Sequence, residues 1–343
     1  MSDNMKDTNE TILEVKDLKQ HFYMGHDGIF GGEKQYVYAV DGISFKIRKG
    51  ETLGLVGESG CGKSTVVRSV AQLYKPTSGE VLLDGKDLTK LSHKDMYAAR
   101  QLMQCVFQDP YSSLDPRMTT AAIIAEPMRI YKKRGILSIS EEEIDSRVEH
   151  LMELVGLSKF FKNRFPHEFS GGQRQRIGIA RALALKPKLI LADEPVSALD
   201  VSIQAQVLNL FKDIQKEMGL SYLFIAHDLA VIKYISDRIC VMYLGKIVET
   251  GDYVDLYKNP LHPYTKALLS AAPIPDPKVE RQRQRIILSG DVPSPTKQRP
   301  GCYFYDRCPN RMECCKNSQP SFVRPEGVAD GHTVACFLYQ KKK

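Results

Sequence analysis

One stretch decides the fold of this chain: Gly57-Glu58-Ser59-Gly60-Cys61-Gly62-Lys63-Ser64-Thr65. It fits the pattern G-x-x-x-x-G-K-[ST], whose glycines let a loop fold back and point N–H groups at phosphate oxygens. The apolar run 52–56 before it predicts a buried strand, and residues 64–74 after it have the apolar spacing of a helix. This order predicts a phosphate-binding loop at the N-terminus of a helix.

The chemistry of such a loop is divided among its residues. The Lys63 ammonium is expected to contact the β- and γ-phosphates of ATP, and the Ser64 hydroxyl is expected to ligate Mg²⁺. Cys61 is expected to act as a small filler in the loop. The expected ATP contacts are Gly57, Ser59, Gly60, Cys61, Gly62, Lys63, Ser64 and Thr65.

Two adjacent carboxylates follow a second apolar strand. Residues 188–192 read KLILA, and Asp193 and Glu194 come directly after them. Such pairs are common on protein surfaces, but beside a phosphate loop they predict a catalytic pair. Asp193 is expected to hold Mg²⁺ through water, and Glu194 is expected to polarise the attacking water as a general base.

A third motif, SGGQR at 170–174, opens a helix expected over 172–185. With the two motifs above, the chain resembles the ATP-binding cassette (ABC) family. The resemblance implies an α/β nucleotide-binding domain with a RecA-like core, an antiparallel β subdomain and a helical subdomain. It also implies that the γ-phosphate of ATP held by an opposite subunit is bound by Ser170, Gly171, Gly172 and Gln173.

The same resemblance assigns four further residues. Gln108 is expected to reach Mg²⁺ and water, and Asp200 lies in a loop expected to cross the dimer. His227 follows an apolar strand expected over 221–226, and it matches the histidine that lies near the γ-phosphate. Phe22 aligns best with the aromatic residue that stacks on adenine, with Tyr23 as the alternative.

Three longer stretches resemble the ATPase subunits of oligopeptide and dipeptide importers. They are VGESG at 56–60, QDPYSSLDPRM at 108–118 and HPYTKALL at 262–269. The sequence AVDG at 39–42 and Cys61 in the loop are similar to the second, or F-type, ATPase of such systems. The resemblance spans nearly the whole chain and implies ATP hydrolysis coupled to peptide import.

That resemblance also implies partners. They are a paralogous ATPase subunit in a heterodimer, two transmembrane permeases and an extracytoplasmic peptide-binding protein, with this chain on the cytoplasmic face of the membrane. An importer of nickel, a sugar or another small solute is an alternative, because no cargo-binding residue lies in this chain. A non-transport ABC ATPase acting on nucleic acid is disfavoured, because the chain has one cassette and no heptad run. No nucleic-acid partner is therefore expected.

Bulk composition agrees with a globular protein. The 343 residues are 43% apolar and 26% charged, with a net charge of +7. No stretch approaches 18 consecutive apolar residues, so no transmembrane helix is expected. The first nine residues are polar and acidic rather than basic and then apolar, which favours a cytosolic location over secretion.

Five of the eight cysteines lie in the last 42 residues. Five, six and 20 residues separate Cys302, Cys308, Cys315 and Cys336. Similar importer ATPases carry such cysteines, where they can hold a [4Fe-4S] cluster. Zinc or another metal, or no metal at all, stay alternatives, and the C-x₂-C spacing usual for structural zinc is absent. The resemblance favours Cys315 over its neighbour Cys314 as the ligand.

The expected organisation is an ABC ATPase domain over 10–255, with a helical subdomain at about 109–170, and a C-terminal cysteine-containing extension over 256–343. Strands are expected at 36–49 and 80–83, and residues 92–165 are expected to be mostly helix. Residues 238–250 predict a hairpin that turns at Gly245. Eight prolines from Pro260 to Pro300 predict an extended connector.

Overall fold

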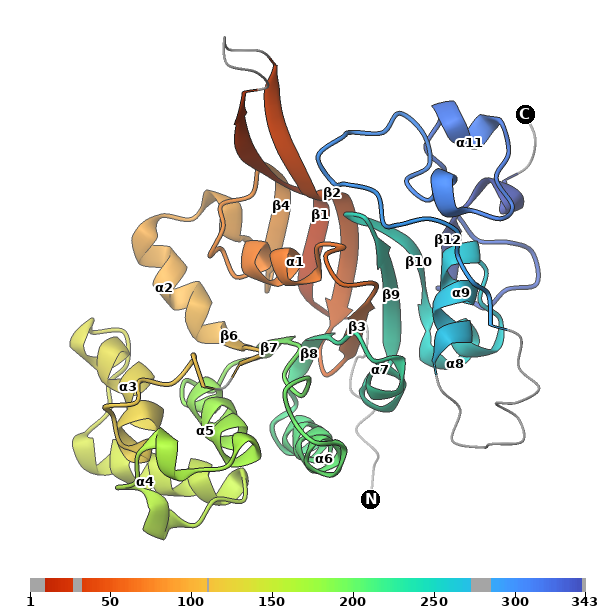
Figure 1. Ribbon diagram of the computed structural model, residues 1–343. Helices are drawn as coiled ribbons and strands as arrows, with labels where there is room; N and C mark the ends of the chain where they lie inside the picture. Colours follow the sequence, from red (N-terminus) through yellow and green to blue (C-terminus); the bar gives the residue numbers. More distant parts are fainter. Residues whose placement is uncertain (1–9, 27–32, 110, 273–284, 341–343) are drawn as a thin grey trace, which may run out of the picture. The chain divides into compact units, whose positions relative to one another are not determined.

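The computed structural model describes residues 10–26, 33–109, 111–272 and 285–340 (Figure 1). Pro110 of the 108–118 stretch, and Pro273, Pro275 and Pro277 of the expected connector, lie outside the described residues. Contacts divide the chain into two compact units. The helical unit comprises the described residues up to Leu13, together with Ile47–Thr52 and Leu82–Ala226. The hairpin unit comprises Glu14–Lys46, Leu53–Val81 and the described residues from His227 onward.

The helical unit contains three parallel strands in the order β8-β7-β6. These are β8 (Ser221–Ile225), β7 (Leu189–Asp193) and β6 (Met103–Val106). All residues of β7 and β8 are buried, which explains their uninterrupted apolar sequence. Helices occupy most of 92–165, as predicted, but β6 was not predicted and lies directly after α2 (His93–Leu102).

A group of helices forms the rest of the helical unit (Figure 1). Helix α3 (Thr120–Lys133) packs against α4 (Glu141–Leu154) and α5 (Gly171–Leu183). The predicted apolar face of α4 is buried at Ile144, Val148 and Leu151. Short 3₁₀ turns, η1 (Leu88–Lys90), η2 (Lys159–Phe161) and η3 (Pro166–Glu168), and the long helix α6 (Val201–Met218) complete it.

The hairpin unit is built on a sheet with the order β11-β12-β10-β9-β3. Strands β3 (Thr52–Val56) and β9 (Arg238–Tyr243) are parallel, while β10 (Lys246–Asp252) pairs antiparallel with β9 and with β12 (Thr333–Ala335). The two-residue strand β11 (Phe322–Val323) lies at the edge. Gly245 turns the β9–β10 hairpin at φ 78°, which confirms the predicted hairpin.

A smaller sheet places β2 (Lys34–Arg48) beside β1 (Thr11–His26), with β4 (Ser78–Leu83) on the other side of β1. The last residues of β4 pair antiparallel with β5 (Lys86–Asp87). Strands β2 and β4 confirm the predictions at 36–49 and 80–83. Strand β1 was not predicted, although its buried positions Ile12, Leu13 and Val15 are apolar.

The described residues after 252 belong to the hairpin unit and contain several short helices. After α7 (Leu229–Ile235) come α8 (Tyr253–Lys258), α9 (Pro263–Ala271), η4 (Tyr305–Arg307), α11 (Cys314–Asn317) and η5 (Phe337–Tyr339). Helix α9 corrects the prediction of an extended connector from Pro260. Pro263 occupies the first helical turn, where a missing N–H costs nothing, and His262 caps the helix.

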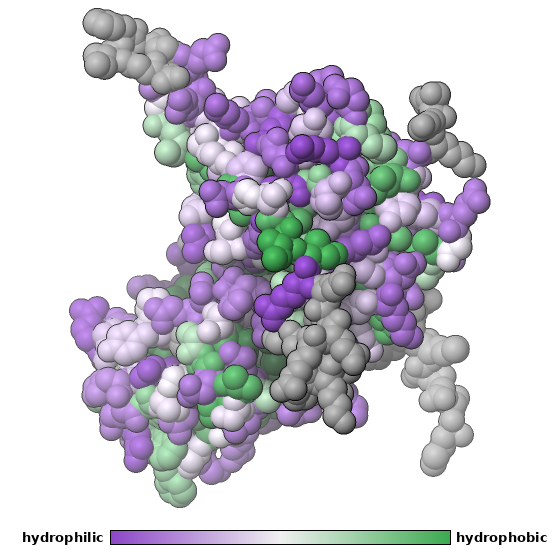
Figure 2. Space-filling view, turned by 45° about the vertical axis from the view of Figure 1, so that its right-hand side comes forward, coloured by the Kyte–Doolittle hydropathy of each residue, from purple (hydrophilic) through white to green (hydrophobic). Residues whose placement is uncertain are grey.

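Among the described residues, no helix combines the length and the apolar character needed to cross a membrane. Figure 2 shows hydrophilic side chains over much of the face it presents.

Candidate functional site

The phosphate loop joins β3 to α1 (Lys63–Val70), as the motif predicts. Gly62 lies at the helix start with φ 106°, and a Cβ there would stand 2.1 Å from the Ala39 carbonyl oxygen. A Cβ on Gly57 would stand 2.1 Å from the Met242 carbonyl oxygen. Two glycines of the motif are therefore required because backbone from β2 and β9 lies against the loop.

Lys63 is buried, and its ammonium hydrogen-bonds with two carbonyl groups of the loop. The Nζ atom donates to the carbonyl oxygens of Gly57 at 2.8 Å and Glu58 at 3.0 Å. Cys61 is also buried, and burial raises the pKa of its thiol, so it stays neutral and fills space as predicted. The Gly245 N–H donates to the Cys61 carbonyl at 2.9 Å, which attaches the loop to the turn of the hairpin.

The acidic pair lies at the end of β7 in the helical unit. Asp193 is buried and stands opposite Ile225 of β8. Glu194 adopts φ 48°, a left-handed conformation unusual for a residue with a side chain. Its N–H donates to the Ile225 carbonyl at 3.1 Å, and its own carbonyl accepts the Ser197 hydroxyl at 3.0 Å. These bonds hold Glu194 in a strained backbone conformation of the kind found at functional sites.

The SGGQ motif caps α5 with a reciprocal pair of hydrogen bonds. Ser170 N–H donates to the Gln173 side chain at 3.0 Å, and the Gln173 N–H donates to the Ser170 hydroxyl at 3.4 Å. A Cβ on Gly172 would meet Ile203 of α6 at 2.4 Å. Gly171 lies against Leu199, since a Cβ there would be 3.5 Å from the leucine side chain. The motif is thus fitted closely against the start of α6.

The segment after β6 contacts α5, the helix that begins with the SGGQ motif. Gln108 is exposed, and two side chains of α5 hold the residues that follow it. The Arg174 guanidinium lies 5.0 Å from the centre of the Tyr111 ring, and Arg181 donates to the Ser113 carbonyl at 2.5 Å. The segment from Gln108 therefore contacts the helix that carries the SGGQ motif.

The remaining predicted residues have the following surroundings. Phe22 is half-buried and meets Tyr74 edge-on at 5.2 Å, whereas Tyr23 is more exposed. His227 is exposed two residues after β8. Asp200 is exposed at the N-cap of α6, and its side chain makes no capping hydrogen bond.

The predicted nucleotide-site residues are divided between the two units. The hairpin unit carries Phe22, His227 and the whole phosphate loop. The helical unit carries Gln108, Asp193, Glu194, Asp200 and the SGGQ motif.

Two side chains outside every predicted site contact the phosphate loop. The Glu58 N–H donates to the Tyr264 hydroxyl at 2.9 Å, and the Arg307 guanidinium pairs with the Glu58 carboxylate at 2.7 Å. Sequence reasoning missed both residues. Tyr264 had a signal, because it lies in the HPYT stretch used for the resemblance, whereas nothing in the sequence singled out Arg307.

The four cysteines predicted to hold a cluster lie near one another in the hairpin unit. The Cys302 N–H donates to the Cys315 carbonyl at 2.8 Å. Burial, with the other cysteines close by, raises the pKa of the Cys302 thiol to about 12 and that of Cys336 to about 11. Within the described residues, however, no three cysteine, histidine or acidic side chains are arranged to hold a metal ion. Of the cysteines outside this region and the phosphate loop, Cys240 is buried and Cys105 half-buried.

Known proteins are similar to this chain in sequence and in fold. The ABC transporter family matches residues 40–197, and the oligopeptide/dipeptide transporter C-terminal region matches residues 248–315. Two similar solved structures each give a TM-score of 0.61. One is a dimer of the ATP-binding cassette MJ0796 with ADP and Pi, which is 30% identical and covers 70% of this chain and 98% of its own. The other is cbiO1 from Clostridium perfringens, which is 27% identical and covers 73% of this chain and 92% of its own. The fold and the loop therefore define an ABC-type ATPase.

Curated relatives narrow the class. The putative oligopeptide transport ATP-binding protein YkfD of Bacillus subtilis is 54% identical, covering 96% of this chain and 96% of the relative. The oligopeptide transport ATP-binding protein AppF of B. subtilis is 52% identical, covering 96% of this chain and 98% of the relative. The oligopeptide transport ATP-binding protein OppF of Escherichia coli is also 52% identical, covering 95% of this chain and 96% of the relative. The chain belongs to the ABC transporter family, in the group that carries the oligopeptide/dipeptide transporter C-terminal region.

Proposed function

We propose that this chain hydrolyses ATP to drive the import of di- and oligopeptides, as one nucleotide-binding subunit of an ABC transporter. The observation that carries the proposal is the phosphate loop at 57–65, held between β3 and α1 in a chain that is similar over 95% or more of its length to oligopeptide transport ATP-binding proteins. The loop supports nucleotide binding, and the relatives support the cargo.

The loop residues fit ATP and Mg²⁺. The two glycines where a Cβ would clash keep the backbone close-packed, and the N-terminus of α1 favours the negative charge of phosphate. Ser64 and Asp193, assisted by Gln108, would hold Mg²⁺ with oxygen ligands, which this ion prefers. The ion would neutralise charge on the β- and γ-phosphate oxygens. Lys63 would contribute a further positive charge to these oxygens.

Glu194 is proposed as the general base, with His227 near the γ-phosphate. A carboxylate held by backbone bonds at a strand end can orient a water molecule without reorganising during the reaction. Phe22 is proposed to stack on the adenine ring.

We propose that the SGGQ motif binds the γ-phosphate of ATP held by a second ATPase subunit, and that Asp200 lies at that junction. The capped N-terminus of α5 supplies N–H groups and a favourable dipole for an anion. The similar MJ0796 cassette forms a dimer with ADP and Pi bound, and this supports a dimeric arrangement. A paralogous subunit is the proposed partner, because AVDG at 39–42 and Cys61 resemble F-type subunits.

The remaining proposed partners are two transmembrane permeases and an extracytoplasmic peptide-binding protein, with this chain peripheral on the cytoplasmic face. The 109–118 loop, in which Tyr111 and Ser113 contact side chains of α5, is proposed to contact the permeases. The proposed domain boundaries stay 10–255 for the ATPase and 256–343 for the extension. No nucleic-acid partner is proposed.

The four cysteines are proposed as ligands of a [4Fe-4S] cluster. Their proximity supports this, but their side chains would have to turn, because they form no metal-holding group as described. Iron and acid-labile sulfide in protein purified without oxygen, together with absorbance near 400 nm lost in a Cys302→Ser variant, are the expected result. Zinc in place of iron, or no metal, would refute the cluster.

The function is tested by the ATPase rate of the chain co-expressed with the subunits encoded beside it. The binding protein is loaded with a dipeptide, a pentapeptide or Ni²⁺. Stimulation by a peptide is expected and would set the preferred cargo length. Stimulation by Ni²⁺ alone, or by none of the three, would remove peptide from the function while leaving the ATPase assignment intact.

A further inference from the structure

We infer that the C-terminal extension positions the ATP-binding loop, and that Arg307 and Tyr264 are the residues through which it does so. Both contact Glu58, the second residue of the phosphate loop. The inference rests on nucleotide binding by the loop and is independent of cargo. Arg307 and Tyr264 are positioning residues, since they act on ATP through Glu58.

Arg307 binds the Glu58 carboxylate through two hydrogen bonds, the bidentate geometry that suits a guanidinium. Its Nη1 donates to Oε2 at 2.7 Å and its Nη2 to Oε1 at 3.3 Å, so both carboxylate oxygens are engaged. The Arg307 side chain is 10% exposed and that of Glu58 is 28% exposed. A two-point pair of this kind fixes direction as well as distance.

Tyr264 holds the same residue by its backbone. Its hydroxyl accepts the Glu58 N–H at 2.9 Å, and the tyrosine is fully buried. Glu58 also has its carbonyl bonded to Lys63 Nζ. The side chain, the N–H and the carbonyl of one loop residue are therefore each occupied, two of them by the extension. Any shift of the extension would displace Glu58 and, through its carbonyl, Lys63.

The two side chains are themselves held rigidly. Phe304, three residues before Arg307, is buried, and its ring centre lies 5.6 Å from that of Tyr264 and 5.1 Å from that of Tyr243. Tyr303 donates to Asp41 at 2.6 Å. The two residues directly before η4, the turn that carries Arg307, are thus both anchored.

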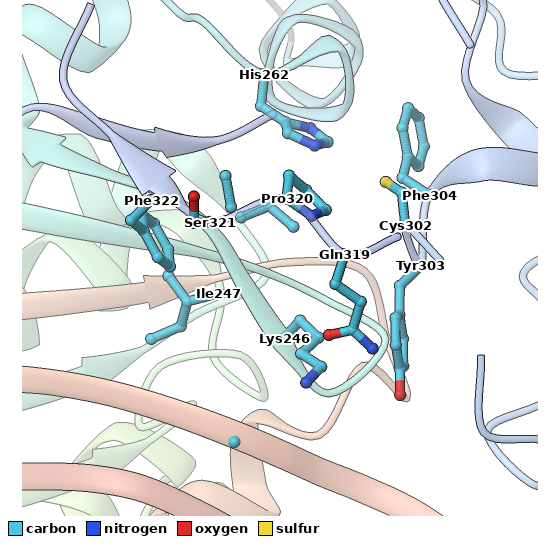
Figure 3. A pocket seen from close by; sticks show the side chains of 13 residues that line it. Lys246, Ile247, His262, Cys302, Tyr303, Phe304, Gln319, Pro320, Ser321 and Phe322 are labelled. Carbon is cyan, nitrogen blue, oxygen red and sulfur yellow. The ribbon is translucent and has the colours of Figure 1, made fainter. Parts of the chain in front are cut away.

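A cavity of about 180 Å³ lies beside these anchors (Figure 3). Tyr303, Lys246 and Gln319 line it together with Cys302, the residue directly before Tyr303. Tyr303 therefore forms part of the cavity wall and also anchors the extension through its hydrogen bond with Asp41.

The buried carboxylate of Glu249 secures the other end of the extension. It accepts the N–H groups of Leu261 and His262 at 2.8 Å each, and it hydrogen-bonds with His332 at 2.8 Å. His262 in turn accepts the Tyr264 N–H at 3.1 Å. One continuous set of bonds therefore runs from His332, directly before β12, through Glu249 and His262 to Tyr264 and the loop.

The test is ATP affinity of the full-length chain, measured with a fluorescent ATP analogue displaced by ATP. Arg307→Met is expected to weaken binding about tenfold, and Tyr264→Phe roughly threefold, because hydrogen bonds to charged groups contribute more than neutral ones. Arg307→Lys restores the charge without the two-point geometry and is expected to fall between Arg307→Met and wild type. In the assembled complex KM for ATP rises while kcat changes less than twofold.

Two controls separate positioning from mere folding. Arg311→Met removes an exposed arginine from the same cysteine region and is expected to leave affinity unchanged. A double-mutant cycle pairs Arg307→Met with Glu58→Gln, and the double variant is expected to bind no more weakly than the worse single variant.

Three results would overturn the inference: a lower melting temperature with unchanged ATP affinity in Arg307→Met, additive losses in the cycle, or equal effects of the Arg311 and Arg307 substitutions. Wild-type protein that fails to bind ATP would instead refute the proposed role of the loop itself.

Discussion

The backbone N–H of Glu194 donates to the carbonyl of Ile225 at 3.1 Å, which ties the carboxylate after β7 to the last residue of β8. The bond fixes Glu194 at φ 48°, so its side chain leaves the strand in one direction. If Glu194 is the general base, Glu194→Gln should lower the ATPase rate at least 100-fold while ATP still binds, because the amide cannot take a proton. The measurement is steady-state phosphate release together with ATP affinity.

Glu217→Gln supplies the matched control for this prediction. It removes an exposed carboxylate on α6 and should leave the rate unchanged. A Glu194→Gln variant that turns over at the wild-type rate would show that another group activates the water.

The glycines of the phosphate loop should differ in their tolerance of a methyl group. Gly62 and Gly60 both have positive φ, at 106° and 78°, but only at Gly62 would a Cβ meet a carbonyl, that of Ala39 at 2.1 Å. Gly60→Ala should therefore cost only about 1 kcal/mol of conformational strain. Gly62→Ala must also move backbone and should weaken ATP binding at least tenfold more than Gly60→Ala. Equal affinities would mean that β2 can move away without cost.

Ser170 has two expected roles that a second serine can separate. Ser170 caps α5 and Ser140 caps α4, and each does so in a reciprocal pair of bonds with a residue three positions on. Replacing either by alanine should cost about 1 kcal/mol of stability. Only Ser170→Ala should also reduce the ATPase rate of the assembled complex, measured beside the melting temperature. Equal ATPase rates would confine Ser170 to capping.

His262 should make the protein sensitive to acid. Burial lowers the pKa of its imidazole to about 4, so the folded protein keeps it neutral. The unfolded chain, with a pKa near 6.5, binds the proton first, so stability is complete above about pH 6.5 and falls progressively towards pH 4. The loss from this group is at most roughly 3 kcal/mol.

Melting temperatures from pH 8 to pH 4 test the His262 prediction by comparison with His262→Asn. Asparagine can still cap α9 but does not titrate, so the variant should lose less stability on acidification than wild type. Parallel curves for the two proteins would assign the acid sensitivity to other groups.

Local sequence was a sound guide where a few adjacent residues determine the backbone. The phosphate loop, the carboxylates after 188–192 and the turn at Gly245 were predicted because each carries its glycine or its apolar run within ten residues. The roles of the residues there stay predictions. Strand β6 escaped prediction because four residues between α2 and a loop give no readable period.

Helix α9 was missed for a different reason. Counting prolines from Pro260 to Pro300 treated all of them as helix breakers, whereas Pro263 begins a helix. The contacts of Tyr264 and Arg307 with Glu58 span 206 and 249 residues, and no local pattern reports such a distance. They follow only from tertiary packing, which the sequence does not display.

The attachment of Glu58 to Arg307 has a consequence for the order of folding during synthesis. The phosphate loop leaves the ribosome early, but its charged partner is added 249 residues later. Asp41 likewise cannot bond with Tyr303, nor Glu249 with His332, until these later residues have been synthesised. At typical translation speeds of about 5–20 residues per second, the nascent loop spends on the order of ten seconds or more without these partners. ATP-binding competence should therefore arrive late in translation, well after the loop itself has been made.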